Sequence, residues 1–386
     1  MVIVQDDEGE TIMTAASRYA FLLIVFLESS ATCWAMGGES AFTTDLQPRV
    51  LGVDVGIGYR GLALLPNVDT TIWAYCGGGY EWMTYYRDAS GVLIAPGGLA
   101  GTGSADPGFT RIEGAWRLGI EQGVAWNERT KRNLVGAFAY YRGRVDVNQI
   151  RPGQLLYAST IADRAGVFLN TILAGFAYDD VLTDPRHKDR HGISAEVSAE
   201  WGPRFFFNTL EGDSDFLRLN ATFSWFQPLY DAAPDRPVNL FTLYLGEYFS
   251  LDYAAGFGAP VPLYIRQTFG GRNQLVGLGA QVRGVDAGSL DTNLKAVNNL
   301  ELRANLPSLF LPDIIPGLVA FWDSGCYAQV GEAGISAPAA GFVTTIGAGA
   351  FLNFLDIGTG AGYVAYRIDG VNAPGRPRPA VISAIS

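Results

Sequence analysis

The chain has 386 residues and is 48% hydrophobic, yet only 17% of its residues are charged, whereas an average soluble domain is about 25% charged. So little charge leaves two fold classes, a large soluble β-fold and a transmembrane β-barrel whose outer surface faces lipid. The net charge of −11 excludes a basic stripe that would neutralise phosphates, so no nucleic-acid partner is expected.

The first 35 residues have the pattern of a secretory signal peptide. Arg18 precedes an apolar core over 20–27, and small residues lead to Ala35. The core is too short to stay in the membrane as an anchor. Because Asp6, Asp7, Glu8 and Glu10 are wrong for the positive end of a signal peptide, we expect translation to start at Met13. The alternative is a buried first helix of a soluble domain.

The remaining chain is expected to form one domain. Residues 36–48 are a short polar segment, interpreted as a periplasmic lead-in, and 49–386 are interpreted as an outer-membrane β-barrel. In the first barrel segment, 50–65, Val53 and Ile57 share one face and Asp54 lies on the other. This alternation of apolar and small or polar residues is typical of a barrel strand.

The alternation continues in later segments. It is clearer over 111–126, where Ile112 and Leu118 share one face while Glu113 and Arg117 lie on the other. Thirteen such segments follow each other along the chain: 50–65, 70–86, 111–126, 131–147, 165–180, 191–203, 215–229, 239–257, 298–307, 317–329, 341–355, 358–369 and 377–385. Since single-chain bacterial barrels have even strand numbers, at least one strand is missing, and we predict 12–16 antiparallel strands.

Aromatic residues gather near the segment ends and favour a membrane-interface girdle over ordinary core packing. They are Trp73, Trp82, Tyr85, Tyr86, Trp126, Tyr140, Tyr141, Trp225, Tyr230, Tyr244 and Tyr248. The stretches 92–108 and 180–192 are expected to be loops, the second of them charged and solvated.

Cysteine and histidine usage gives no support for a metal site. Cys33 falls in the signal, and Cys76 and Cys326 lie in separate segments, so a disulfide requires that their strands meet. His187 and His191 are four residues apart but follow a proline in the charged loop, with no helix to align them. There is no nucleophile-elbow, phosphate-cradling or zinc-protease signature. We therefore expect no enzyme, no cofactor and no metal.

Short motifs in the final third are more specific. Residues 269–278 read FGGRNQLVGL, 299–303 read NLELR, 321–325 read FWDSG and 346–349 read IGAG. In this order and spacing they resemble the bacterial surface-antigen superfamily, which includes the BamA- and TamA-like outer-membrane protein insertases and the two-partner secretion transporters. The resemblance covers about residues 242–370.

The positions that match the family pattern are Gly270, Gly271, Leu275 and Gly277 in the first motif, Glu301 and Arg303 in the second, and Phe321, Asp323 and Gly325 in the third. The resemblance implies sixteen strands and a loop folded into the barrel lumen. It also implies that an arginine of this loop pairs with the aspartate of the third motif.

The arginine of the loop has to be assigned among several positions. In the direct register it falls on Val276, whereas Arg283, seven residues later, keeps the family's Arg-Gly pair with Gly284. We predict that Arg283 pairs with Asp323, because a guanidinium fork on a carboxylate would fix the loop in the lumen. Arg272 is the second candidate, and the alternative is that both charges face water.

The resemblance further implies a function in inserting or translocating protein, or lipid, at the bacterial outer membrane. Outer-membrane lipid and unfolded outer-membrane or secreted proteins are the implied partners. The insertases carry periplasmic polypeptide-transport-associated (POTRA) modules before the barrel, and residues 36–48 are too short for one. We therefore expect that their substrate docking is either absent or supplied by a separate periplasmic partner. The last segment, interrupted by Pro377 and Pro379, fits a weak first-to-last strand seam. A passive porin-like channel and a structural barrel that anchors a partner are the two alternatives.

Overall fold

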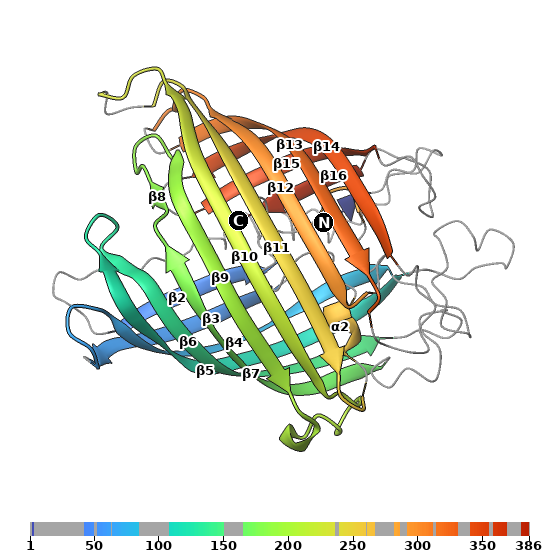
Figure 1. Ribbon diagram of the computed structural model, residues 1–386. Helices are drawn as coiled ribbons and strands as arrows, with labels where there is room; N and C mark the ends of the chain where they lie inside the picture. Colours follow the sequence, from blue (N-terminus) through green and yellow to red (C-terminus); the bar gives the residue numbers. More distant parts are fainter. Residues whose placement is uncertain are drawn as a thin grey trace, which may run out of the picture.

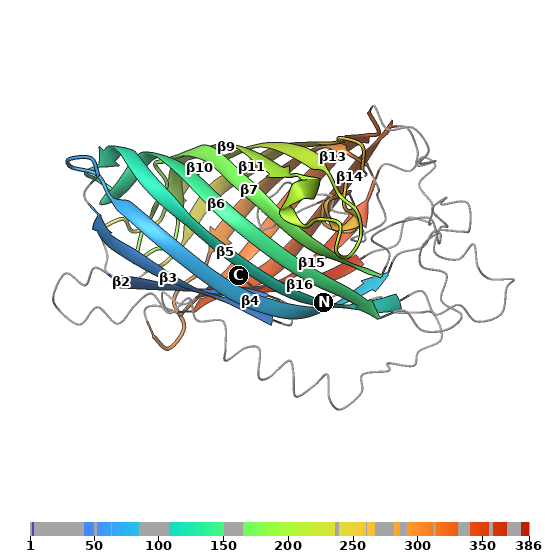
Figure 2. The same ribbon diagram turned by 90° about the horizontal axis from the view of Figure 1, so that it is seen from below.

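The computed structural model describes residues 2–3, 42–49, 52–62, 64–84, 108–149, 165–235, 239–259, 261–266, 282–285, 292–311, 314–330, 340–354, 358–368 and 380–385. These residues form one antiparallel sheet that curls into a barrel of tilted strands (Figures 1 and 2). No helix in these ranges is long and apolar enough to cross a membrane.

The strands follow each other as an antiparallel meander. They are β1 (Val2–Ile3), β2 (Phe42–Arg49), β3 (Gly52–Leu62), β4 (Thr70–Thr84), β5 (Gly108–Asn127), β6 (Arg132–Gln149), β7 (Gly166–Asp179), β8 (Leu182–Thr183), β9 (Arg190–Gly202), β10 (Phe216–Asp231), β11 (Thr242–Gly256), β12 (Leu294–Asn305), β13 (Ile314–Ala328), β14 (Ala340–Phe354), β15 (Gly358–Arg367) and β16 (Ala380–Ile385). From β2 each longer strand pairs with the next as far as β16, which also pairs with β1, while β8 pairs only with β9.

Each of the thirteen predicted segments corresponds to one strand from β3 to β16, with β8 left aside. The antiparallel all-β barrel is thereby confirmed. The strands β1 and β8 are only two residues long, so fourteen longer strands are described. The sixteen full strands that the resemblance implies remain a prediction.

Strand β2 is the strand that the sequence did not predict. It occupies residues that were assigned to the lead-in 36–48, so the series of longer strands begins at Phe42 and not at residue 49. The polar sequence around Pro48 does not read as a strand. Pro48 nevertheless pairs with Val53 at the end of the strand order, where a missing N–H is tolerated.

The two faces of the sheet differ as predicted. On β3, Val53, Val55 and Ile57 are exposed, while Gly56 and Gly58 are buried toward the lumen. Because apolar side chains on the outside and small or polar ones inside suit hydrocarbon around the barrel, the exposed residues form the lipid-facing surface. The aromatic residues divide between the two faces. Tyr141 and Tyr230 are exposed, but the girdle assignment was wrong for others that are buried in the lumen, which are Trp73, Tyr140, Tyr244 and Tyr248.

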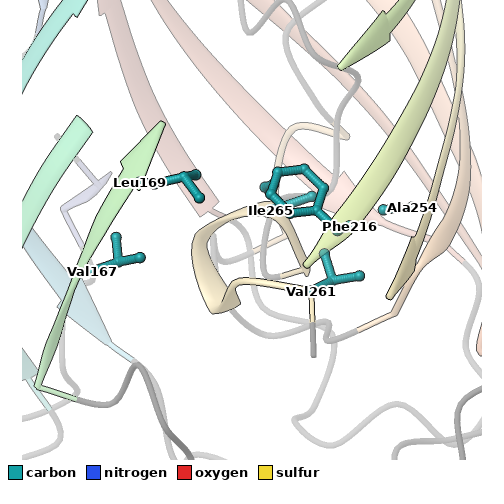
Figure 3. Packing of buried hydrophobic residues seen from close by; sticks show 6 residues of the cluster. All are labelled: Val167, Leu169, Phe216, Ala254, Val261 and Ile265. Atoms are coloured by element: carbon teal, nitrogen blue, oxygen red, sulfur yellow. The ribbon is translucent and has the colours of Figure 1, made fainter. Parts of the chain in front are cut away.

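A segment of the long β11–β12 connection packs inside the barrel. It contains the short helix α2 (Leu263–Arg266), which follows the end of β11. Val261 and Ile265, 2% and 1% exposed, pack against Phe216 of β10 and against Leu169 of β7 (Figure 3). This cluster turns part of the lumen into an apolar core, because the connection covers side chains that would otherwise line a water-filled pore.

Candidate functional site

The candidate site is the contact between the β11–β12 connection and the lumen wall at Arg283. The Arg283 side chain donates from Nε to Asp323 Oδ2 and from a terminal nitrogen to Asp323 Oδ1, both at 2.7 Å. The backbone N–H of Arg283 donates to the same carboxylate at 3.0 Å. Arg283 is 3% exposed and Asp323 is fully buried. A bidentate, charge-assisted pair of this kind holds the loop in one orientation.

A second carboxylate extends the contact. Arg283 donates from its other terminal nitrogen to Glu301 Oε1 at 2.5 Å, and Arg303 Nε donates to Glu301 Oε2 at 2.5 Å. Glu301 has no exposed surface. We call Arg283, Glu301, Arg303 and Asp323 the Arg283 cluster. It contains two arginines and two carboxylates, so its charges balance and none is buried alone.

The strands position the cluster through their alternation and register. On β12, Glu301 and Arg303 are two residues apart and therefore share the lumen face. On β13, Phe321 and Asp323 share the same face, and Phe321 pairs with Glu301 across the ladder. The cluster therefore follows from the period-two pattern of the second and third motifs.

Aromatic rings complete the surroundings of the guanidinium. The Arg283 guanidinium carbon lies 3.6 Å from the centroid of the Phe321 ring and 5.1 Å from that of Tyr363. Phe321 and Tyr363 meet edge to face at 5.8 Å. A cation over an aromatic face is further stabilised in a site without water.

Two glycines are required by this geometry. Gly284 has a φ of 83°, which L side chains rarely adopt, so it turns the chain directly after Arg283. At Gly347 a Cβ would lie 2.2 Å from the Val364 carbonyl oxygen and 2.3 Å from the Phe321 ring. Gly347 thus leaves the space in which Phe321 lies under the guanidinium.

Burial and ion pairing act in opposite directions on Arg283. Burial lowers the pKa of its guanidinium, but the hydrogen bonds and charge of Asp323, together with the charge of Glu301, raise that pKa above its usual value. The guanidinium therefore stays charged in its contact with the two carboxylates.

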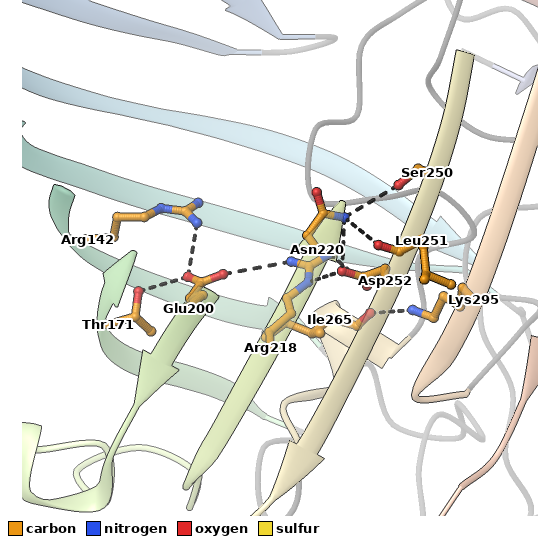
Figure 4. Close-up of polar contacts among 10 residues, drawn as sticks. All are labelled: Arg142, Thr171, Glu200, Arg218, Asn220, Ser250, Leu251, Asp252, Ile265 and Lys295. Carbon is orange, nitrogen blue, oxygen red and sulfur yellow. Dashed lines mark hydrogen bonds and ion pairs between the residues drawn. The ribbon is translucent and has the colours of Figure 1, made fainter. Parts of the chain in front are cut away.

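A second polar cluster holds the helix end of the same connection (Figure 4). Arg218 of β10 donates to both oxygens of Asp252 on β11, at 2.7 and 3.1 Å. Lys295 of β12 donates from Nζ to the Ile265 carbonyl at 2.6 Å and is 2% exposed. Glu200 of β9 lies 3.9 Å from Arg218. The sequence did not predict these contacts, although the charges alternate along the lumen faces of their strands.

The other predicted positions fall in three groups. Gly325 lies on the lumen side of β13, in register with Val297 of β12. The loop-motif residues lie outside the residues that the structure describes, as do Arg272 and Val276; these motif residues are Gly270, Gly271, Leu275 and Gly277. Cys76 and Cys326 are free and exposed on β4 and β13, so they do not form a disulfide in this structure.

The charged loop with the histidines is more structured than the sequence predicted. Residues 180–190, the rim loop, fold toward the barrel end at which β11 begins. His187 is 2% exposed and its Nδ1 lies 2.7 Å from Asp231 Oδ2, while Asn305 donates to the His187 carbonyl at 2.8 Å. The expectation of a solvated loop was therefore wrong for His187, because Asp231 and Asn305 converge on it from separate strands. In the part of the chain that the structure describes, no group of three or more His, Cys, Asp or Glu residues could hold a metal ion.

The rim loop gives a pH-dependent prediction. Burial, and then the charge of Asp184, raise the pKa of Asp189 above the ordinary aspartate value. The folded state binds this proton more tightly than the unfolded chain does, so Asp189 reduces stability increasingly as the pH rises through and above the ordinary aspartate range. We expect Asp189→Asn to raise the melting temperature at pH 7, with the gain shrinking toward pH 4.

The matched control for this prediction is Asp180, in the same loop. Hydrogen bonds from Arg129 and Asn127 lower the pKa of Asp180. Asp180→Asn should therefore lower the melting temperature at pH 7, and this loss should shrink as the pH falls through the ordinary aspartate range. If both variants shifted the melting temperature in the same direction, the assignment of opposite pKa shifts would be wrong.

Comparisons with known proteins agree with this geometry. Residues 108–359, well over half of the chain, match the Omp85 superfamily domain. Among solved structures, the chain is similar to BamA from Haemophilus ducreyi lacking POTRA domains 1–3, with a TM-score of 0.53 and 13% identity over 90% of this chain and 65% of that one. This chain thus spans less than two thirds of the length of that BamA structure.

A second similarity is weaker. The transport unit of the autotransporter AIDA-I from Escherichia coli matches with a TM-score of 0.25 and 10% identity over 95% of both chains, too low a score to indicate a shared fold. No curated protein matches. The family match covers β5 to β14 and includes the whole Arg283 cluster. The chain belongs to the Omp85 superfamily.

Proposed function

We propose that this bacterial outer-membrane barrel assists the insertion or translocation of protein at the outer membrane, with a lumen loop that is fixed by the Arg283 cluster. The main observation that supports this proposal is that the Arg283 side chain binds Asp323 and Glu301 inside the barrel at 2.5–2.7 Å. An open pore does not require a buried, charge-balanced contact between a loop and the lumen wall. Such a contact is expected in a barrel whose lumen stays obstructed while a substrate engages it.

The proposed mechanism is mechanical and not enzymatic. The described parts of the β11–β12 connection contact the wall at α2 and again at Arg283, and we propose that the connection thereby obstructs the lumen. The described strand order ends at β2 on one side and at β16 with β1 on the other. We propose that these ends form the seam at which a substrate strand engages. Unfolded outer-membrane or secreted protein is the proposed substrate, with outer-membrane lipid around the barrel and a periplasmic protein as the proposed partner.

The test is single-channel conductance in planar bilayers, with the refolded wild type beside Asp323→Ala. The wild type is expected to show small, flickering currents because the loop obstructs the lumen. Asp323→Ala should give larger or more frequent openings, because Arg283 loses its bidentate partner.

A passive porin-like channel gives the opposite result. Large, steady currents that are the same in both proteins would refute the obstructed barrel and favour the channel. Copurification of one stable partner, with no current in either protein, would favour a structural anchor.

A further inference from the structure

The β9–β10 connection exposes an unusual number of large apolar side chains. Phe205 and Phe207 are 67% and 68% exposed, and Leu210 is 67% exposed. They lie around the 3-10 helix η1 (Arg204–Phe206), between two of the predicted strand segments. We call Trp201, Phe205, Phe206, Phe207 and Leu210 the aromatic knob.

The knob is continuous with the lipid-facing surface of the barrel. Trp201, at the end of β9, is 41% exposed and pairs with Ile172 of β7, which is also exposed. The Trp201 ring contacts Phe205 edge-on at 5.5 Å and Phe206 at 6.2 Å. Glu200, the preceding residue, is buried on the lumen side. The rings therefore extend the outer face beyond the end of the strand.

The knob is held rigidly and is not a loose loop. Asn208 has no exposed surface, and its side chain donates to the carbonyls of Pro203 and Asn170, both at 2.9 Å. Asn170 also donates two hydrogen bonds to this loop. Its backbone N–H donates to Asn208 Oδ1 at 2.6 Å, and its side chain donates to the Phe206 carbonyl at 2.8 Å. Phe207 has a φ of 65°, a left-handed conformation that costs free energy in a non-glycine residue. The buried Asn208 contacts hold the chain in that conformation.

Charge near the knob fits a boundary between lipid and water. Arg204 pairs with Asp213 at 2.9 Å, and both side chains stay partly exposed. Aromatic rings that are flanked by charged groups favour the interface of a bilayer, where one side is apolar and the other is hydrated. In water, Phe205, Phe207 and Leu210 would form a large exposed apolar patch.

We propose that the aromatic knob is a membrane anchor, which inserts Phe205, Phe207 and Leu210 into the interfacial layer of the bilayer leaflet next to β9 and β10. This leaflet lies at the barrel end from which the lumen loop departs, since β10 begins there and β11 ends there. The occupant is lipid, because the knob continues the face that already contacts lipid. A rigid anchor at this end fixes the height of the barrel in the bilayer, close to the connection that carries α2.

The experiment places a nitroxide label at Phe207→Cys in a background without Cys33, Cys76 and Cys326. The protein is reconstituted in nanodiscs that hold one barrel each, and label collisions with oxygen and with a water-soluble nickel chelate are measured. Val197→Cys, exposed on the lipid face of the same strand β9, is the membrane reference. Glu128→Cys, whose native side chain is 81% exposed in a turn, is the water reference.

We expect the Phe207 label to collide with the nickel chelate several-fold less often than the Glu128 label, and to report a shallower depth than Val197. Nickel accessibility equal to that of Glu128 would overturn the proposal. Folding is checked by heat-modifiable gel mobility. If Phe207→Cys does not fold, Leu210→Cys gives the same readout, because its native side chain is equally exposed and its backbone bonds are unchanged.

Discussion

Asp323→Ala is expected to lower the free energy of unfolding by about 3–5 kcal/mol, because it leaves the Arg283 guanidinium buried without its bidentate partner. Asp323 accepts three hydrogen bonds from Arg283. Glu301 accepts one bond from Arg283 at Oε1 and one from Arg303 at Oε2. Among the described residues, Glu301 stays in contact with Arg283 after the loss of Asp323, but it is shared with Arg303 and does not replace the bidentate pair. The measurement is urea unfolding of the barrel in lipid vesicles, followed by tryptophan fluorescence.

The control for Asp323→Ala is Glu128→Ala, which removes an ion pair whose side chains are 71% and 81% exposed. It should change the unfolding free energy by at most about 1 kcal/mol. A double variant, Arg283→Met with Asp323→Leu, removes both charges and should recover most of the loss. If the double variant were as unstable as Asp323→Ala, the loss would come from packing and not from an unpaired charge.

Phe216→Ala is expected to lower the unfolding free energy by about 3–5 kcal/mol and to release the α2 segment from the wall. Phe216 is fully buried, and it packs where Val261 and Ile265 enter the lumen. The remaining cavity removes the main apolar support of α2. Urea unfolding gives the energy, and limited proteolysis within 257–293 reports the release.

The control lies on the same strand. Phe223 is 37% exposed on the lipid side of β10, so Phe223→Ala removes apolar surface from lipid without touching the lumen. It should reduce stability but leave the protease protection of 257–293 as in the wild type. Equal protease sensitivity in both variants would show that Phe216 does not support α2.

The strands could be predicted from sequence because their environment is uniform. Lipid outside and small or polar groups inside impose a period of two on the strands. Strands such as those at 50–65 and 111–126 can therefore be predicted from their own sequence, without knowledge of the strands that pair with them. Strand β2 was missed for a physical reason. It is only eight residues long and lies at the end of the strand order, where Pro48 is tolerated, so its alternation of Phe42, Thr44 and Leu46 with polar residues is too short to stand out in the sequence.

The site was only partly predictable. The pairing of Arg283 with Asp323 was a prediction based on the family resemblance, and Arg283 Nε lies 2.7 Å from the Asp323 carboxylate in the structure. Its role in fixing the loop stays a prediction. The contact of Lys295 with Ile265 could not be found, because a lysine on a lumen face reads as a pore-lining charge. The inserted helix, four residues long, contacts that position through the Ile265 carbonyl, and Lys295 is buried.

Aromatic residues show the same limit. Tyr140 and Tyr141 are neighbours in sequence, yet 7% and 42% of their respective side chains are exposed, because they point to opposite faces of β6. Composition predicts that aromatics are present near the membrane interface. It does not tell which of two adjacent rings contacts lipid and which one packs in the lumen.

In the part of the β11–β12 connection that the structure describes, contacts with the lumen wall at α2 and at Arg283 affect how the connection can be released. One contact, at α2, involves β7, β10 and β12, and the other, at Arg283, involves β12 and β13. Because both belong to one chain segment, the connection binds the wall as a bivalent ligand, and each contact keeps the other at a high effective concentration. Either contact can therefore open and reclose quickly while the segment stays in the lumen. Complete release requires that both open together, so it is far rarer than either partial opening.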